Sequence, residues 1–250
     1  MTTPSYLPSS HGHKLAYHHS KGTAPTVVFL PGFMSDMEGS KAVALEQHCR
    51  KKGQAFLRFD YSGHGQSEGA FEEGTIGEWA SDVVDLLTRV VDGDLLFIGS
   101  SMGGWISLLT ATNPAIKPRV KAFIGIAAAP DFTDKIMTPH FTRGQLDDLK
   151  AKGHTYLPSD YEDPYPITQK LLEDGKKQAV LDGPIDLDIP IRLLQGDKDT
   201  AVPAKWPFKI KDLVTSNDVE ITIVKGGDHS LSSDNDLVRL MRNLDLLLDK

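Results

Sequence analysis

Short runs of Val, Ile, Leu and Phe alternate with longer amphipathic stretches along most of this 250-residue chain. Turn residues bound each short run, which is typical of strands that are buried on both faces of a parallel sheet. We predict strands at Lys14–His18, Thr26–Leu30, Ala55–Phe59, Leu95–Ile98, Val120–Ile126, Pro190–Leu194 and Val219–Val224. Because strands that alternate with helices build βαβ units, the sequence predicts an α/β fold with a mostly parallel sheet and helices on both faces.

Several of the predicted helices have recognisable ends. Thr75 and Glu78 have the spacing of a capping box at the start of one helix. A second helix, Ser40–Lys52, is followed by Gly53, a residue that favours the left-handed conformation after a helix end. The last helix, Ser233–Leu248, places its leucines along one stripe. A chain of this length fits one α/β domain, so we predict a single domain over residues 1–250.

The alternation stops between Asp131 and Leu187. This stretch contains helical pieces and five prolines, and it has no convincing core strand. An interruption of this length is too long for a simple loop. We predict that residues 131–187 form a small helical cap, inserted in the domain before the strand Pro190–Leu194.

Composition excludes several classes of function. Hydrophobic residues make up 40% of the chain and charged residues 24%, which is typical of a globular protein, and the net charge of −7 argues against a nucleic-acid partner. The longest apolar runs are far shorter than the roughly 20 residues that span a bilayer. The single cysteine, Cys49, excludes a disulfide within the chain and a multi-cysteine metal site. Residues 1–5 lack the features of a secretory signal, so we expect a cytoplasmic protein.

The strongest chemical motif is Gly99-Ser100-Ser101-Met102-Gly103, which lies between a predicted strand and a helical run. This context is the one that a nucleophile elbow requires. A serine held on so sharp a turn leaves no space for side chains two residues before and after it, and glycine meets that condition. Ser100 is an alternative nucleophile, but only Ser101 has glycines placed symmetrically on both sides.

A serine hydroxyl needs a base and an acid to activate it. His229 follows the last predicted strand, at the sheet edge where the sites of open α/β folds lie. Asp197 and Asp199 both follow the strand Pro190–Leu194. Asp197 is expected to cap a turn, and we therefore choose Asp199 as the acid. The order Ser101, Asp199, His229 is the one expected for an α/β-hydrolase triad.

Acyl transfer also needs donors for the oxyanion that forms in the transition state. One is expected to be the N–H of Met102, directly after the nucleophile. The other is expected to be the N–H of Phe33, in the loop Pro31-Gly32-Phe33-Met34. Gly32 lets this loop approach the serine closely. The side chains of Phe33, Met34 and Met102 are then expected to edge the acyl pocket.

The chain resembles the α/β-hydrolase superfamily over nearly its full length. The segments that carry this resemblance are Leu30–Phe33, Arg58–Ser67, Gly99–Trp105, Gly196–Pro203 and Asp228-His229. The second segment is a structural turn in this superfamily, so its His64 is not expected to be the base. Superfamily members often have His-Gly in the oxyanion loop, whereas this chain has Pro31-Gly32, and no substrate contact of that histidine is carried over.

Three of these stretches resemble more closely the mitochondrial acyl-protein thioesterases that also cleave acyl-glucuronides. They are Phe59–Gly63, Gly99–Trp105 and Ile191–Leu194. The resemblance implies a carboxylic ester or thioester substrate, either a small molecule or an acylated protein. Acyl transfer to water through Ser101 and His229 is expected to need no metal or organic cofactor. We expect substrate contacts from Gly32, Met34, Phe132, Phe141 and Tyr156.

Other functions stay open at this point. The same scaffold supports carbon–carbon bond hydrolysis and perhydrolysis, and a relative that only binds its ligand is a further alternative. The chain is expected to be a monomer or a homodimer.

Overall fold

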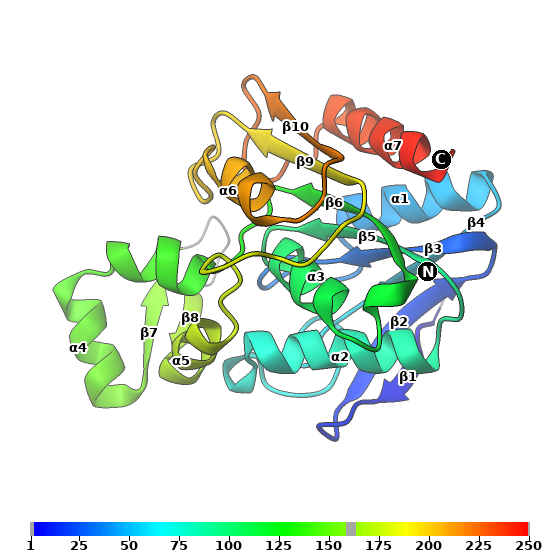
Figure 1. Ribbon diagram of the computed structural model, residues 1–250. Helices are drawn as coiled ribbons and strands as arrows, with labels where there is room; N and C mark the ends of the chain where they lie inside the picture. The colour runs from blue at the N-terminus through cyan, green and yellow to red at the C-terminus, as the bar shows by residue number, and fades with distance from the viewer. Residues whose placement is uncertain (1–2, 159–163, 250) are drawn as a thin grey trace.

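The computed structural model describes residues 3–158 and 164–249, and its centre is an eight-stranded sheet (Figure 1). The strand order is β1-β2-β4-β3-β5-β6-β9-β10. Only the pairs β1–β2 and β2–β4 are antiparallel, and the other pairs are parallel. The strands are β1 (Ser5–Pro8), β2 (Lys14–Ser20), β3 (Thr23–Leu30), β4 (Gln54–Phe59), β5 (Leu95–Ser100), β6 (Val120–Ile126), β9 (Ile191–Gly196) and β10 (Val219–Val224).

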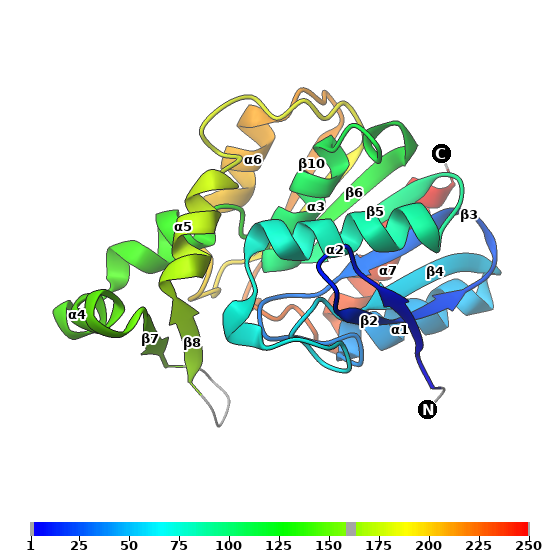
Figure 2. The same cartoon turned by 90° about the horizontal axis from the view of Figure 1, so that it is seen from below.

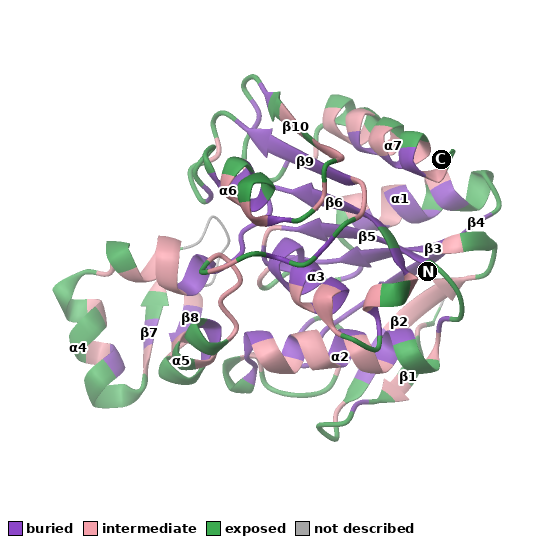
Figure 3. Ribbon diagram, in the orientation of Figure 1, coloured by how far each residue is buried: buried purple, intermediate pink, exposed green. Residues whose placement is uncertain are grey.

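All seven predicted strands are present, with ends shifted by a few residues at most, so the predicted mostly parallel α/β sheet is confirmed. Within this sheet, the strand that the sequence did not indicate is β1, whose residues are exposed or only half-buried. Such an edge strand carries no continuous apolar run. By contrast, every residue of β4, β5 and β9 is buried, which is the pattern that made these strands recognisable (Figure 3).

Helices cover both faces of the sheet (Figure 2). On one face lie α1 (Ser40–Lys51) and α7 (Asp234–Leu248), and on the other α2 (Ile76–Arg89), α3 (Met102–Thr112) and α6 (Trp206–Leu213). Successive residues of a strand point to opposite faces. In β3, therefore, Val27 and Phe29 pack with α1 and α7, whereas Val28 and Leu30 belong to the core under α2 and α3.

The helix ends lie where the sequence predicted them. The side chain of Thr75 accepts a hydrogen bond from the N–H of Glu78 at 3.2 Å, and α2 begins at Ile76. This is one of the two hydrogen bonds of the predicted capping box, and the carboxylate of Glu78 instead lies 3.5 Å from Nζ of Lys170. Helix α1 ends at Lys51, and Gly53 has a φ of +68°, as its position after the helix predicts. Short helical turns lie at Phe71–Glu73, Lys117–Arg119 and Thr138–His140.

Residues 131–187, the inserted segment, extend from the carboxyl ends of the central strands (Figures 1 and 2). The segment contains a π-helical turn at Thr133–Met137, the helices α4 (Arg143–Lys152) and α5 (Gln169–Lys177), and the strands β7 (His154–Leu157) and β8 (Tyr165–Thr168). The two strands pair with each other as a separate antiparallel ribbon, which the sequence did not predict. Each has only four residues, too few to give a periodic signal.

Asp131 ties the beginning of the inserted segment to its end. Its carboxylate is fully buried and accepts hydrogen bonds from the N–H groups of Val180 and Leu181, both at 2.9 Å. Its φ of +58° lies in the left-handed region, which Asp and Asn tolerate better than most residues. One side chain therefore joins two points of the chain about fifty residues apart.

Asp131→Asn should lower the free energy of unfolding by about 2 kcal/mol, because one carboxylate oxygen that accepts a backbone N–H becomes an amide nitrogen. Urea unfolding measures this loss. Asp134→Asn is the control: Asp134 lies in the same segment, and its 3.7 Å ion pair with Lys176 is partly exposed, so its removal should cost less than about 1 kcal/mol. Equal effects of the two substitutions would contradict the role assigned to Asp131.

In the part of the chain that the structure describes, no helix is both long enough and apolar enough to cross a bilayer.

Candidate active site

The parallel sheet brings the loops that carry the candidate residues to one edge. Leu30 pairs with Gly99, and Gly196 pairs with Val224, so the carboxyl ends of β3, β5, β9 and β10 lie together in pairs. The loops that follow these strands contain Gly32, Ser101, Asp199 and His229 respectively. Residues from four distant parts of the sequence thus meet at the edge of the sheet where α/β folds place their sites.

Ser101 occupies a tight turn between β5 and α3. Its φ of +52° and ψ of −116° form a conformation that is strained for a residue with a side chain. A Cβ at Gly99 would lie 2.5 Å from the hydroxyl of Ser107, and a Cβ at Gly103 would lie 2.6 Å from the carbonyl oxygen of Pro31. The two glycines therefore have the steric role that the motif predicted.

The hydroxyl of Ser101 lies 3.1 Å from Nε2 of His229, and Nδ1 of His229 lies 2.9 Å from Oδ2 of Asp199. An ionised carboxylate can only accept, so Nδ1 carries a hydrogen and donates it to Asp199. Nε2 of the neutral ring is then free to accept the hydrogen of the Ser101 hydroxyl. The structure thus brings the three predicted residues together in the order and orientation that a serine nucleophile needs.

Asp199 is held by four donors. Oδ1 accepts the N–H groups of Ala201 and Val202, both at 2.8 Å, and Oδ2 accepts the side-chain amide of Gln195 at 2.7 Å in addition to His229. Burial of this carboxyl group would raise its pKa, but the hydrogen bonds from His229, Val202 and Gln195, together with the charge of His229, outweigh burial and lower it. Asp199 is therefore ionised at neutral pH.

Asp197, the alternative acid, does not contact His229. Its Oδ1 accepts the N–H of Gly226 at 2.6 Å, which links the turn after β9 to the turn after β10. This is the structural role that the sequence analysis assigned to it.

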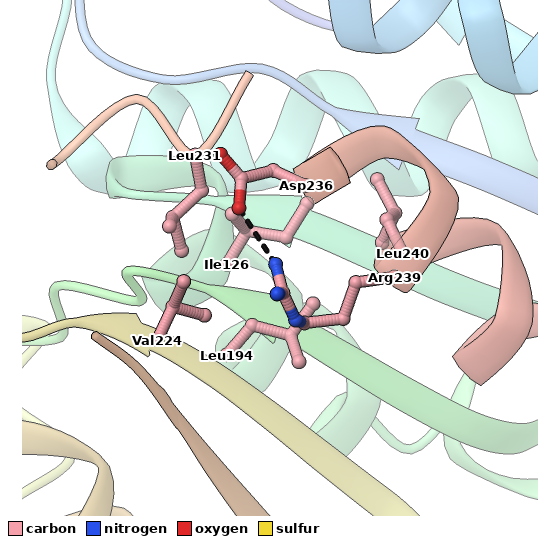
Figure 4. Close-up of a pocket in the computed structure, with 7 residues that line it drawn as sticks. All are labelled: Ile126, Leu194, Val224, Leu231, Asp236, Arg239 and Leu240. Carbon is pink, nitrogen blue, oxygen red and sulfur yellow. Dashed lines mark hydrogen bonds and ion pairs between the residues drawn. The ribbon is translucent and has the colours of Figure 1, made fainter. Parts of the chain in front are cut away.

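The loop that carries His229 is anchored on both sides. Leu231 is buried, and it lines a small cavity together with Ile126, Leu194, Val224, Leu240 and the Asp236–Arg239 ion pair (Figure 4). The cavity between these side chains measures about 10 Å³, room for about one water molecule and too little for a substrate. The apolar contact under Leu231 therefore serves to position the loop.

From the other side, Nζ of Lys41 donates to the carbonyl oxygen of Ser230 at 2.6 Å and to the hydroxyl of Ser232 at 2.9 Å. Burial lowers the pKa of Lys41 to about 8, although the charges of Asp228 and Asp236 oppose this shift. The residue directly after His229 is thus fixed by a side chain of α1.

The two amides predicted to bind an oxyanion come from Met102, directly after Ser101, and from Phe33, in the loop after β3. Met102 is the first residue of α3, where an N–H has no partner within the helix. A Cβ placed on Gly32 would lie 3.5 Å from the Cβ of Ser101, so the loop that carries Phe33 passes close to the serine. That these two N–H groups donate to an oxyanion stays a prediction.

The side chain of Phe33 connects the loop after β3 to the inserted segment. Its ring centroid lies 5.7 Å from those of Phe132 and Tyr165, and 4.9 Å from that of Phe71 on the main body. Phe132, one of the predicted substrate contacts, is buried and also packs edge-on against Trp105 at 5.7 Å. The aromatic group therefore spans the boundary between the sheet and the inserted segment.

The remaining predicted contacts are placed differently. Met34 is 41% exposed with a φ of +53°, next to Phe33. Tyr156 is 52% exposed on β7, and its ring contacts His154. Phe141 is half-buried at the start of the loop before α4. Within the described residues, neither Phe141 nor Tyr156 makes a ring contact with Phe33, so their contact with substrate stays a prediction.

His64, which the resemblance set aside as a base, is buried in an aromatic cluster. Its ring lies 5.0 Å from those of Phe71 and Trp79, and Nδ1 contacts the carbonyl oxygen of Ser62 at 3.2 Å. Burial lowers its pKa to about 4, although the contact with Ser62 opposes the shift. His64 is therefore neutral at physiological pH, and its role is to pack in this aromatic cluster.

Sequence reasoning missed two residues around the site. Tyr165 gave no signal, because it lies in the short strand β8. Gln195 did give one: it is a polar residue directly after the predicted strand Pro190–Leu194 and shortly before Asp199, and it is next to last in β9. In the described part of the chain, no group of three or more His, Cys, Asp or Glu side chains is arranged to hold a metal ion.

Comparison with curated proteins gives clear relatives. The mouse protein named mitochondrial palmitoyl-protein thioesterase ABHD10 is 38% identical over 250 residues, covering 98% of this chain and 82% of that protein. The human protein of the same name is 36% identical over 254 residues, covering 100% of this chain and 81% of that protein. These relatives are named mitochondrial. The expectation of a cytoplasmic protein is therefore wrong, because it relied on the first five residues alone.

Solved structures agree with these relatives. The mouse alpha/beta hydrolase domain-containing protein 10 superposes with a TM-score of 0.91 at 37% identity, and 99% of each chain is covered. A hydrolase of Agrobacterium vitis S4 superposes with a TM-score of 0.93 at 32% identity over 98% of each chain. The alpha/beta hydrolase fold family matches residues 25–183. The chain thus belongs to the α/β-hydrolase fold family.

Proposed function

We propose that this protein is a serine hydrolase that cleaves acyl thioesters and carboxylic esters through an acyl-enzyme formed on Ser101. The observation that carries the proposal is the continuous hydrogen-bonded chain from the Ser101 hydroxyl through His229 to Asp199. That chain supplies a nucleophile, a base and a fixed tautomer of the base, which are the requirements of acyl transfer by serine.

In the first half of the reaction, Nε2 of His229 takes the proton of Ser101 while Oγ attacks the acyl carbon. The N–H groups of Met102 and Phe33 stabilise the negative charge that develops on the carbonyl oxygen. The imidazolium then donates its proton to the leaving sulfur or oxygen, and the bond to the acyl carbon breaks. Asp199 stays ionised throughout, since its hydrogen bonds lower its pKa.

In the second half, a water molecule replaces the departed thiol or alcohol. His229 removes a proton from this water, and the oxygen attacks the acyl carbon of the ester on Ser101. Collapse of the tetrahedral intermediate returns the proton to Ser101 and releases a carboxylic acid. Side chains of the protein perform every proton transfer in this scheme.

The physiological substrate that we propose is a long acyl chain held as a thioester on a protein cysteine. The support is the name of the mouse and human relatives, palmitoyl-protein thioesterase. We also propose that residues 131–187 serve as a cap of the single domain 1–250. The aromatic contacts of Phe33 with Phe132 and Tyr165 support this, because an apolar boundary suits an acyl chain.

The proposal is tested with matched acyl donors. Hydrolysis is measured with p-nitrophenyl butyrate and palmitate, and with a peptide carrying S-palmitoyl-cysteine or O-palmitoyl-serine. We expect hydrolysis of the esters and the thioester, and an initial burst of p-nitrophenolate close to one equivalent per active site if deacylation is slow. Folded protein that hydrolyses none of these substrates would contradict the proposed function. Preference for butyrate over palmitate would contradict only the long-chain substrate.

A further inference from the structure

A buried glutamine lies directly behind the acid of the proposed triad. Gln195 is next to last in β9, and only 1% of its surface is exposed. Its Nε2 lies 2.7 Å from Oδ2 of Asp199, the same oxygen that accepts the Nδ1–H of His229. The amide thus touches the acid at the atom through which the acid acts on the base.

The orientation of this amide follows from its neighbours. Besides Asp199, the carbonyl oxygens of Val202 at 3.3 Å and Gly196 at 3.5 Å lie near the same end of the side chain. All three are acceptors, so the NH₂ group must face them and the oxygen must point away. One N–H donates to the carboxylate, and the other is directed at the backbone of the turn that contains Asp199.

The other end of the amide is not satisfied. Oε1 of Gln195 is buried, and it has no hydrogen-bond partner among the residues that the structure describes. A buried polar atom without a partner costs free energy, so the oxygen end of the side chain does not account for a glutamine here. The NH₂ end does, through its hydrogen bond to the buried carboxylate of Asp199.

We propose that Gln195 is a positioning residue, whose amide holds Oδ2 of Asp199 in line with His229. The N–H groups of Ala201 and Val202 fix only Oδ1, and Gln195 supplies the second point that fixes the plane of the carboxylate. The proposal rests on the proposed function, because it assigns Gln195 a role through Asp199 and His229. Gln195 itself touches neither substrate nor reacting atoms in this scheme.

The contact has two consequences for the reaction. Without the amide, the carboxylate loses its second anchor, and the ring of His229 is held less firmly toward Ser101, which slows the chemical step without weakening substrate binding. The amide also draws negative charge from Oδ2. Its loss leaves a stronger carboxylate beside the ring, which favours the imidazolium and moves the acid limb of the pH–rate profile upward. Two other carboxylates flank the site, and neither is hydrogen-bonded to His229. Asp197 accepts the N–H of Gly226, and Asp228 accepts the N–H of Leu231.

The test compares Gln195→Met with the wild-type protein. We expect kcat to fall about 10-fold with little change in KM, and the acid limb of kcat/KM to move to higher pH by a few tenths of a unit. Gln195→Leu provides a second apolar replacement if the methionine variant folds poorly. Gln54→Met is the matched control, because Gln54 is a buried glutamine of β4 that bonds to the backbone of Thr23 and Pro25. The kcat and the pH profile of the Gln54→Met variant should match those of the wild type.

A double-mutant cycle with Asp199→Ala separates positioning from general stability. If Gln195 acts through Asp199, adding Gln195→Met to Asp199→Ala should cause no further loss of kcat. A full additional 10-fold loss in that background, or an unchanged pH profile in Gln195→Met, would overturn the proposal. Wild-type activity of Asp199→Ala alone would instead overturn the triad, so the two failures are distinguishable.

Discussion

Ser101→Ala should lower kcat by roughly 10⁴-fold or more for every ester and thioester that the wild-type protein cleaves. The substitution removes the only atom that the structure places within hydrogen-bond distance of Nε2 of His229 in the described residues. Any remaining turnover would come from water attacking a substrate polarised by the oxyanion donors. Initial rates with p-nitrophenyl butyrate, measured over a wide range of protein concentration, determine the loss.

Ser100→Ala is the matched control for this prediction. Ser100 is the last residue of β5, it is 8% exposed, and its neighbour in the sequence is the proposed nucleophile. Its replacement should leave kcat within a few-fold of wild type. Circular dichroism and urea unfolding should show both variants folded, because alanine removes only a hydroxyl group at either position. A folded Ser101→Ala variant with near-wild-type turnover would remove Ser101 from the role of nucleophile.

Asp199→Asn should lower kcat by about 10³- to 10⁴-fold, for a reason that the hydrogen bonds of the acid make specific. The N–H groups of Ala201 and Val202 require an acceptor at the position of Oδ1. The oxygen of asparagine must take that position, so its NH₂ group faces His229. The ring is then driven to the tautomer that carries its hydrogen on Nε2, and this tautomer cannot accept the proton of Ser101.

Asp197→Asn is the control for the choice between the two aspartates. Asp197 is exposed, and its Oδ1 accepts the N–H of Gly226, a bond that the oxygen of asparagine preserves. The kcat of the Asp197→Asn variant should stay within a few-fold of the wild-type value. The reverse result, a large loss at position 197 and a small one at 199, would reassign the acid.

The sequence predicted seven of the eight strands of the main sheet and the loops at its edge. The clearest of these strands, such as β5 and β9, are buried at every residue, since burial on both faces forces a continuous apolar run. The strands β2 and β10 were also predicted, although they are only partly buried. The position of Ser101 followed from sterics, because Gly99 and Gly103 leave no space for a Cβ in the structure. The base and the acid were then limited to the His and Asp residues that directly follow a predicted strand.

What the sequence could not predict depends on contacts between distant segments. The ribbon of β7 and β8 has strands of four residues, and the approach of Tyr165 to Phe33 depends on how the inserted segment lies against the main body. The anchoring of the His229 loop by Lys41 joins residues 189 positions apart. The prediction of a cytoplasmic protein failed for another reason, since the first few residues carry too little information to decide localisation.

The central claim is that Ser101 becomes a reactive nucleophile because His229 and Asp199 activate it. The most direct measurement is the reaction of the native protein with a fluorophosphonate, followed by mass spectrometry of its peptides. We predict one phosphonyl group per chain on the peptide of Ser101, formed with loss of fluoride, with no labelling in Ser101→Ala and much slower labelling in His229→Ala. Folded native protein that stays unlabelled, or that carries the label on another residue, would contradict the account.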